Sequence, residues 1–369
     1  MKRIRIVESK HTTSPPAIAK NFASDNTAAV SPAIMEAMLA ANTGRAAAYG
    51  ADEYTARVEK TLCEVFEREL SVFLVSTGTA ANSLCLSAMS PPWGHIFCHP
   101  GSHIHNDECA APEFYTHGAK LLPVDGPSAK INVNTLASSS RLKRGDVHVT
   151  QPHAVSITQA TEIGSVYSID EIKRISEVCQ ATSMRLHMDG SRFANALVSL
   201  ACTPAEMTWK AGVDALSFGA TKNGAMGVEA IILFDQSLAA EMGYRRKRAA
   251  HLTSKMRYLS VQMEAYLQDD LWLKNAAHAN DMALRLRQGL QQISDIEVLG
   301  ETQANIIFCR LPETMTTALL KQGYAFLHGR WEAGVVRFVT SFATTIAEVE
   351  QLLASMRDIH AQQAAERAA

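Results

Sequence analysis

The sequence predicts an α/β protein in which a large domain with a mainly parallel central sheet precedes a smaller C-terminal α/β domain. Short apolar segments alternate with amphipathic, helix-like segments from about residue 53 to residue 234. This alternation is typical of parallel strands connected by helices that cover the sheet. We expect a flexible leader at residues 1–20, a large domain with an N-terminal arm at residues 21–270 and a small domain at residues 271–369.

Individual elements follow from local start and stop signals. Ser31 and Pro32 begin a helix, because proline suits the first helical position. Ser168 and Glu171 have the spacing of a capping box. Strands are expected at residues 71–75, 95–99, 120–124, 154–158, 184–188, 216–219 and 230–234. Helices are expected at residues 31–39, 53–69, 83–89, 133–141 and 168–180, with another beginning near residue 106.

The small domain is expected to contain both strands and helices. Its strands are predicted near residues 296–299, 305–311 and 335–341. Apolar residues at helical spacing between residues 346 and 359 predict a closing amphipathic helix, followed by a polar tail at residues 362–369.

Composition limits the classes of partner. The 369 residues carry a formal net charge of −2, which offers no electrostatic footprint for nucleic acid or an anionic membrane surface. No uncharged apolar run is long enough to span a bilayer, and no signal-peptide core follows the basic N-terminus. Seven cysteines, an odd number, indicate reduced thiols. We therefore expect a cytoplasmic protein with a small-molecule partner.

Residues 76–82, Ser-Thr-Gly-Thr-Ala-Ala-Asn, follow an apolar strand and open a helix. Free backbone N–H groups at a helix N-terminus, together with hydroxyl groups, suit a phosphate. A plain helix capped by Thr79 explains this stretch equally well. No Gly-Lys-Ser/Thr ends the stretch, so it is not a nucleotide-hydrolysing Walker loop.

An acid and an amine follow two other predicted strands. Asp189 precedes Gly190, and Lys222 lies between Gly219 and Gly224. Taken singly, each residue also has a structural explanation. Asp189 could be an acid in a turn, and Lys222 could be a solvated loop residue. Binding sites of parallel sheets lie at the carboxyl ends of the strands, where residues 76–82 also lie. Pyridoxal phosphate requires all three parts, because its phosphate, its pyridine nitrogen and its aldehyde need amides, a carboxylate and an amine. The sequence therefore predicts this cofactor.

Two arginines are candidates for binding the carboxylate of an amino-acid substrate. Arg192 follows Asp189 closely, and Arg337 lies within an otherwise apolar predicted strand. A charge-assisted hydrogen bond is worth about 1.5–3 kcal/mol, and a bidentate pair also orients the substrate. A structural ion pair is the alternative for each arginine.

A cluster of histidine and cysteine residues raises the question of a metal site. Its members are Cys98, His99, His103, His105 and Cys109. Their spacing matches no closed zinc pattern, so we expect no metal. A histidine here is better suited to lying on a cofactor ring or moving a proton. The neighbouring Asp107 and Glu108 are interpreted as helix-start acids that need no functional role.

Several motifs together resemble the low-specificity L-threonine aldolases, which are pyridoxal-phosphate enzymes of fold type I, the aspartate aminotransferase-like fold. The likeness runs from about residue 21 to the last helix. The motifs are Phe22-Ala23-Ser24-Asp25-Asn26, Tyr49-Gly50, residues 76–82, His103 with Asp107-Glu108-Cys109, residues 187–192, residues 219–224 and residues 336–340. Within this family the branch of L-phenylserine aldolases looks closest, through residues 91–94, 106–109 and 337–345.

The resemblance implies roles for individual residues. The catalytic residues would be Lys222, which would bond to the cofactor, His103, which would stack on its ring, and Asp189, which would pair with its pyridine nitrogen. The cofactor would be held by Thr77, Gly78, Thr79, His103, Asp189, Arg192, Lys222 and Arg257. The substrate would contact Ser24, Tyr49, Arg192 and Arg337. Arg257 and Tyr49 would reach a neighbouring subunit's site, which implies a homodimer or homotetramer with shared active sites.

The implied reaction is cleavage of β-hydroxy-α-amino acids, L-phenylserine or L-threonine, to glycine and an aldehyde by a carbon–carbon lyase. A β-eliminating lyase, a transaminase and a non-catalytic binder of sugar phosphates or nucleotides are the alternatives. Many threonine aldolases have a second histidine in the loop where this chain has residues 159–164, Gln-Ala-Thr-Glu-Ile-Gly. The expected base is His103, or a water that His103 holds, and the loop supplies no histidine to replace it.

Overall fold

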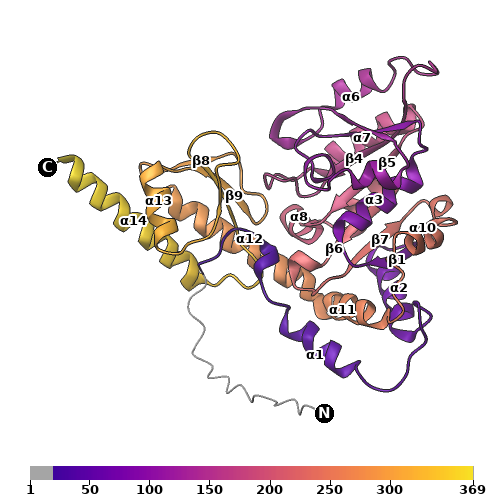
Figure 1. Cartoon of the computed structure of the whole chain (residues 1–369), viewed down its shortest axis with the longest axis horizontal. Helices are drawn as coiled ribbons and strands as arrows, with labels where there is room; N and C mark the ends of the chain where they lie inside the picture. Colours follow the sequence, from indigo (N-terminus) through magenta and orange to yellow (C-terminus); the bar gives the residue numbers. More distant parts are fainter. Residues whose placement is uncertain (1–19, 369) are drawn as a thin grey trace, which may run out of the picture.

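The computed structural model describes residues 20–368 and contains a large and a small sheet in separate lobes (Figure 1). The large sheet has the strand order β1-β7-β6-β5-β4-β2-β3. In this sheet β7 is antiparallel to its neighbours, and the other strands are parallel to one another. Its strands are β1 (Ser71–Val75), β2 (Gly94–Cys98), β3 (Lys120–Pro123), β4 (Gln151–Thr158), β5 (Arg185–Gly190), β6 (Ala215–Gly219) and β7 (Glu229–Leu233). The predicted mainly parallel sheet is confirmed. Residues 1–19 of the expected leader lie outside the described residues.

Helices cover both faces of this sheet. On one face Leu84 of α3 packs in a cluster with Ile96 of β2. On the other face Phe193 of α8 contacts Phe218 of β6 with ring centroids 5.6 Å apart. Because both faces are covered, β2, β6 and β7 are buried along their whole lengths and are mainly apolar in sequence. The α-helices of this lobe are α1 (Pro32–Ala40), α2 (Glu53–Val65), α3 (Gly78–Met89), α4 (His103–Asn106), α5 (Ala111–Tyr115), α6 (Val133–Ser139), α7 (Ile169–Ala181), α8 (Phe193–Leu200), α9 (Pro204–Met207), α10 (Met242–Arg248) and α11 (Arg257–Leu267).

Three local predictions need correction, and one is confirmed. The helix α3 begins at Gly78 rather than at residue 83, and Thr77, not Thr79, is its N-cap. The single helix expected near residue 106 is two short helices, because Cys109 and Ala110 have φ values of 49° and 58° that no α-helix continues through. The capping box of Ser168 and Glu171 is present.

The small lobe packs helices on one face of an antiparallel sheet. The strands β8 (Glu297–Leu299), β9 (Ile306–Arg310), β10 (Leu327–His328) and β11 (Val335–Val339) have the order β10-β11-β9-β8. The helices are α12 (Leu271–Leu290), α13 (Glu313–Lys321) and α14 (Ile346–Ala368). Phe22 of the N-terminal arm is 1% exposed and belongs to this core. The arm is therefore attached to the small lobe, although it precedes the large one in the sequence.

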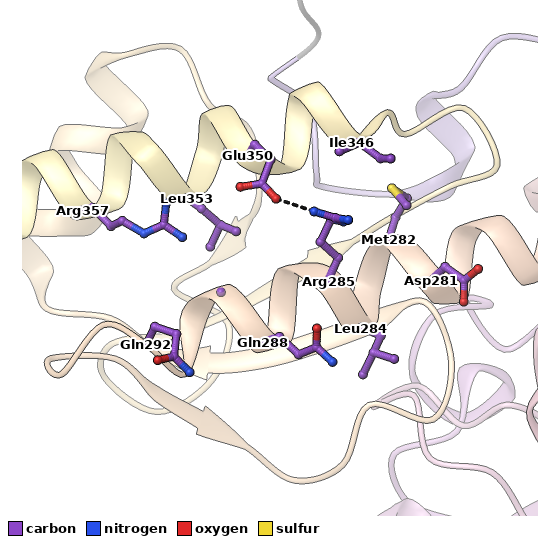
Figure 2. A pocket seen from close by; sticks show the side chains of 11 residues that line it. Asp281, Met282, Leu284, Arg285, Gln288, Gln292, Ile346, Glu350, Leu353 and Arg357 are labelled. Carbon is purple, nitrogen blue, oxygen red and sulfur yellow. Dashed lines mark hydrogen bonds and ion pairs between the residues drawn. The ribbon is translucent and has the colours of Figure 1, made fainter.

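The helix α14 continues to Ala368, so the expected polar tail is helical instead. Figure 2 shows α14 lying along α12, with Arg285 pointing across the groove between them to Glu350 at a distance of 2.7 Å. Beside this ion pair the two helices approach closely at Gly289, opposite Leu353. Within residues 20–368, no helix is both long enough and apolar enough to cross a membrane.

We expect Gly289→Ala to destabilise the protein. An added Cβ would lie 2.2, 2.6 and 2.9 Å from Cδ1, Cδ2 and Cγ of Leu353, so the whole side chain, which is 1% exposed, would have to shift. Such overpacking costs about 1–3 kcal/mol, which exceeds the gain of roughly 1 kcal/mol that alanine has over glycine in a helix. Urea unfolding followed by circular dichroism measures the change in the free energy of unfolding.

The matched control is Gly243→Ala in α10, where no heavy atom lies within 4 Å of the added Cβ. This variant should be neutral or more stable by up to about 1 kcal/mol, because only the helix propensity changes. An equal loss of stability in both variants would contradict the packing explanation.

Candidate active site

The carboxyl ends of β1, β5 and β6 bring the three predicted cofactor-binding segments together. A Cβ added to Gly78, which follows β1, would lie 3.6 Å from Oγ of Ser191, which follows β5. A Cβ added to Gly219, at the end of β6, would lie 2.5 Å from the carbonyl oxygen of Ser191. Glycine is required at residue 219 because the backbone of β6 passes so close to that of β5. The helix start, Asp189 and Lys222 therefore border one site.

The N-terminus of α3 presents donors at this site. Thr77 Oγ1 accepts a hydrogen bond from the N–H of Ala80 at 3.1 Å and so caps the helix. The N–H groups of Gly78 and Thr79 lie in the first turn, where an α-helix supplies no acceptors. Ser76 Oγ lies 3.0 Å from Nδ1 of His251. These groups form an anion site of the kind that the sequence predicts for a phosphate.

Asp189 is a buried acid that is held in its ionised form. It is 1% exposed, and it accepts hydrogen bonds from the N–H and Oγ of Ser191 at 3.1 and 2.8 Å and from Nδ2 of Asn82 at 3.1 Å. Burial by itself would raise the pKa of Asp189, but the charge of His103 and the hydrogen bonds from Ser191 lower it below its usual value. The carboxylate therefore stays charged inside the protein.

A chain of buried polar groups connects Asp189 to His103. Asn82 Nδ2 also donates to Oε1 of Glu108 at 2.8 Å, and Nδ1 of His103 lies 2.7 Å from the same oxygen. The hydrogen bond with Glu108 raises the pKa of His103, an effect that burial opposes and that the charge of Asp189 reinforces. Glu108 is 4% exposed and lies between α4 and α5, so it is not the helix-start acid that the sequence predicts. It fixes the ring of His103.

Lys222 lies in the 3₁₀ turn η4 (Thr221–Asn223) directly after β6. Asn223 anchors this turn by donating to the hydroxyl of Tyr266 and to the carbonyl of Trp272, both at 2.8 Å. Within residues 20–368 the Lys222 ammonium has no hydrogen-bond or ion-pair partner. Its positive charge helps to lower the pKa of Asp25, and it also acts on the buried Glu229, whose pKa is raised by burial. The amine is thus held in place but free to react.

Arg192 is paired within the protein. Its Nε and Nη2 donate to the two carboxylate oxygens of Asp25 at 2.8 and 3.0 Å, and these two side chains are 5% and 2% exposed. Asn305 of the small lobe donates to Asp25 as well, at 3.1 Å. Nε and Nη2 of Arg192 therefore form a structural ion pair, which was the alternative to substrate binding. Nη1 is not engaged by Asp25.

Arg337 lies in β11 and is left incompletely paired. Its Nε is buried without a hydrogen-bond partner, and Nη1 is 3.9 Å from Oε2 of Glu162 in the loop after β4. Burial and the charge of Arg192 lower the pKa of Arg337, and the charge of Glu162 partly offsets them. A buried guanidinium with a free donor is well suited to an incoming carboxylate.

Three predicted residues lie apart from this network of contacts. Ser24 caps the turn η1 (Asp25–Thr27) and accepts from the N–H of Asn26 at 3.2 Å. Tyr49 is 52% exposed, with Lys247 Nζ 5.1 Å above its ring. Arg257 donates to the carbonyl of Thr43 at 3.1 Å. No contact within residues 20–368 joins Tyr49 or Arg257 to Lys222.

Sequence reasoning missed the partners of these groups. The sequence shows Asp25 only as part of a motif and Glu108 only as an acid near a helix start. Asn305 carries no local signal. Glu162 was visible as the acid in the loop that lacks a histidine, but nothing in the sequence places it opposite Arg337.

The residues fit pyridoxal phosphate in the chemistry of their groups. Lys222 offers an amine without a partner, Asp189 an ionised buried acid, and the first turn of α3 free N–H groups at the same edge of the sheet. In the described part of the chain, no group of three or more histidine, cysteine or acidic side chains is arranged to hold a metal ion.

Comparisons with known proteins identify the family of this chain. Residues 21–312 match the beta-eliminating lyase family. Low-specificity L-threonine aldolases of a Pseudomonas species and of Pseudomonas aeruginosa are 42% and 41% identical to this chain over 92% of its length, and the matches cover 98% and 97% of those proteins. A threonine aldolase of Leishmania major superposes with a TM-score of 0.86 at 28% identity, over 92% of this chain and 99% of that one. The chain therefore belongs to the beta-eliminating lyase family and, within it, to the low-specificity L-threonine aldolases, which are fold-type I enzymes that depend on pyridoxal phosphate.

Proposed function

We propose that this protein cleaves β-hydroxy-α-amino acids to glycine and an aldehyde by breaking the Cα–Cβ bond. The observation that carries the proposal is the gathering of a free amine and two guanidinium groups around one buried acid. The charges of Lys222, Arg192 and Arg337 all act on Asp25. The reaction requires an amine for the cofactor and a cation for the substrate carboxylate. The 42% identity to a low-specificity L-threonine aldolase supports the same reaction.

Each residue has a defined task in this proposal. Arg337, assisted by Arg192, would bind the substrate carboxylate and so fix the orientation of the bonds at Cα. Asp189 keeps a proton on the pyridine nitrogen, because an ionised carboxylate favours the protonated ring. When bound at Lys222, pyridoxal phosphate supplies an electron sink for the pair that remains on Cα.

His103 is held through one of its ring nitrogens. Its Nδ1 lies 2.7 Å from Oε1 of Glu108, and this contact raises the pKa of His103. Its ring remains the candidate to stack on the cofactor, as the family resemblance implies. A stacked ring is placed by the cofactor and not by the β-hydroxyl group, so the base that takes the β-hydroxyl proton can be a different group.

We propose an aromatic preference, with phenylserine as the better substrate. A cavity of about 620 Å³ between the lobes is lined partly by Ile163, Phe308, Trp331 and Val335. Phe308 is paired in register with Arg337 across β9 and β11, so both side chains lie on the same face of the small sheet. The apolar part of this cavity, on the face of the small sheet that carries Arg337, supports binding of a phenyl group at Cβ.

We propose further that the enzyme is a homodimer or homotetramer with shared active sites. The exposed ring of Tyr49 and the exposed Met226, at 52% and 50%, support a surface that a second subunit covers. In this arrangement Tyr49 and Arg257 complete the site of the neighbouring subunit.

Lys222→Ala should abolish turnover and the visible absorbance that added pyridoxal phosphate produces in the wild type. The reason is that no other amine is proposed to bond to the cofactor. Glycine and aldehyde should be identified as products, since pyruvate and ammonia would indicate a β-eliminating lyase. Lys210→Ala, which removes an exposed ion pair with Glu67, is the control and should keep both properties. A colourless wild type would favour a non-catalytic binder, and a yellow, active Lys222→Ala would exclude the assignment of this lysine.

Glu108→Gln should move the titration of His103 to lower pH. The charge-assisted hydrogen bond with Glu108 is the largest cause of the raised pKa of His103, and a neutral amide at residue 108 removes the negative charge from it. Because the pKa of His103 is raised in the folded protein, the stability from this pair is complete below the ordinary histidine pKa near ~6.5 and is lost as pH rises through the raised value. Proton NMR of the ring measures the titration.

The companion measurement is urea unfolding of the same variant against pH. The loss of stability relative to wild type should be greatest at acid pH and should shrink toward alkaline pH. The control is Asp107→Asn, an exposed neighbour that does not contact the ring. Identical His103 titrations in the wild type and Glu108→Gln would disprove the coupling.

Phenylserine should have a higher kcat/KM than threonine, and Phe308→Ala should reduce that difference. Loss of the aromatic contact is expected to lower kcat/KM for phenylserine about tenfold, which corresponds to ~1.4 kcal/mol, within the range for aromatic pairs. Threonine, whose methyl group is too short to contact the ring, serves as the control substrate. Both diastereomers of each substrate should be assayed with the aldehyde identified. A threonine preference in the wild type would rule out the aromatic one.

A further inference from the structure

Glu162 lies on a tightly held loop at the carboxyl end of β4. Gln159 starts the loop by donating its N–H to the carbonyl of Asp189 at 2.8 Å, and its side chain exchanges two hydrogen bonds of 2.9 Å with the backbone of Tyr167. Within the loop the N–H of Thr161 donates to the carbonyl of Ser165 at 2.9 Å. Glu162 is therefore held at a defined position beside the active site and not on a free segment.

Cationic groups from three elements face the Glu162 side chain. Its Oε2 is 3.9 Å from Nη1 of Arg337 in β11, and the side chain is 22% exposed. Its negative charge also acts on Arg192, which follows β5, and on His103 of α4. The same cations are those proposed to bind the substrate and the cofactor. Glu162 thus lies inside the reacting region.

The other acids of the site are occupied by hydrogen bonds. Asp25 accepts from Arg192, Asp189 from Ser191 and Asn82, and Glu108 lies in contact with His103 and Asn82. Glu229 accepts the N–H of Ala220 at 2.7 Å. Glu162 has only the contact of 3.9 Å with Arg337, which is too long for a hydrogen bond. Among residues 20–368 it is the acid of this site whose oxygens have no hydrogen-bond donor.

We infer that the Glu162 carboxylate is the base that takes the β-hydroxyl proton, an inference that rests on the proposed function. Only Cα and Cβ separate the substrate carboxyl carbon from the hydroxyl oxygen. A substrate whose carboxylate binds Arg337 therefore carries its hydroxyl group close to the residue that already contacts Arg337. A general base must lie within hydrogen-bond reach of the proton that it takes, directly or through one water.

The proton and electrons balance in this step. The O–H bond of the β-hydroxyl breaks, and its proton bonds to a carboxylate oxygen of Glu162. The electron pair of that bond becomes the second bond of the aldehyde carbonyl. The Cα–Cβ bond breaks, and its pair remains on Cα, where the electron-sink chemistry of the cofactor stabilises it. A proton from water then completes glycine at Cα, and Glu162 returns its own proton to water.

A purely structural role for Glu162, as a counter-ion that orients Arg337, gives different results. Loss of a counter-ion would change the binding of every amino acid through its carboxylate. Loss of a base changes only the step that needs the hydroxyl proton. Glycine has the carboxylate but no hydroxyl group, so its binding separates the two roles.

The test uses the holoenzymes of wild type, Glu162→Gln, Glu162→Ala and the control Glu177→Gln, an exposed acid of α7 that lines no part of the cavity beside Arg337. Cleavage of phenylserine and threonine gives kcat and KM, and calorimetry gives the dissociation constant of glycine. We expect Glu162→Gln to lower kcat at least 100-fold, in line with the usual contribution of a general base, and to leave the glycine dissociation constant within about twofold. Formate should restore activity at least tenfold in Glu162→Ala but not in Glu162→Gln, because the amide fills the space.

The remaining results overturn the inference in distinguishable ways. A kcat within about threefold of wild type in Glu162→Gln would exclude a base role. A tenfold change in the glycine dissociation constant, with an equal change in KM and an unchanged kcat, would make Glu162 a positioning residue for Arg337. If the wild type releases no glycine and aldehyde, the proposed function falls together with the inference, whereas an active wild type with an active Glu162→Gln removes the inference alone.

Discussion

The buried ion pair between Asp25 and Arg192 is the interaction on which the arrangement of the site depends. Asp25 belongs to the N-terminal arm, Arg192 follows the central strand β5, and Asn305 of the small lobe donates to the same carboxylate. Removing one partner of such a pair leaves a buried charge and costs about 3–5 kcal/mol. Three parts of the chain that are remote in sequence are therefore fixed to one another beside Lys222.

A second set of buried contacts determines how protons are held. Asp189, Asn82, Glu108 and His103 form one connected chain from the centre of the sheet to the short helix α4. Asn82 donates to both carboxylates, and the hydrogen bond with Glu108 and the charge of Asp189 both raise the pKa of His103. The acids of the site are thus of two kinds: those that accept hydrogen bonds, and Glu162, which accepts none within residues 20–368.

The proposed reaction follows from this division. Fixed charges at Arg337 and Asp189 provide binding and electronic control, whereas proton transfer needs a group that is free to gain and lose a proton. Lys222 and Glu162 have no hydrogen-bond partners within residues 20–368, and they lie after different strands, β6 and β4. The topology of the parallel sheet, with most of its carboxyl ends at one edge, places both residues at that edge.

The α/β class and most strand positions follow from the sequence alone, and residues 76–82, Asp189, Lys222 and Arg337 are recognisable in it as site candidates, because each is a local signal: an apolar run, a helix cap, a polar residue after a strand. The sequence misplaces the start of α3 and the position of Glu108, and it gives no partners for Asp25, Asn305 and Glu162. The folded chain supplies these, because they arise from contacts between residues that are distant in the sequence. Asp25 and Asn305 are separated by 280 positions, and no periodicity or spacing predicts their hydrogen bond.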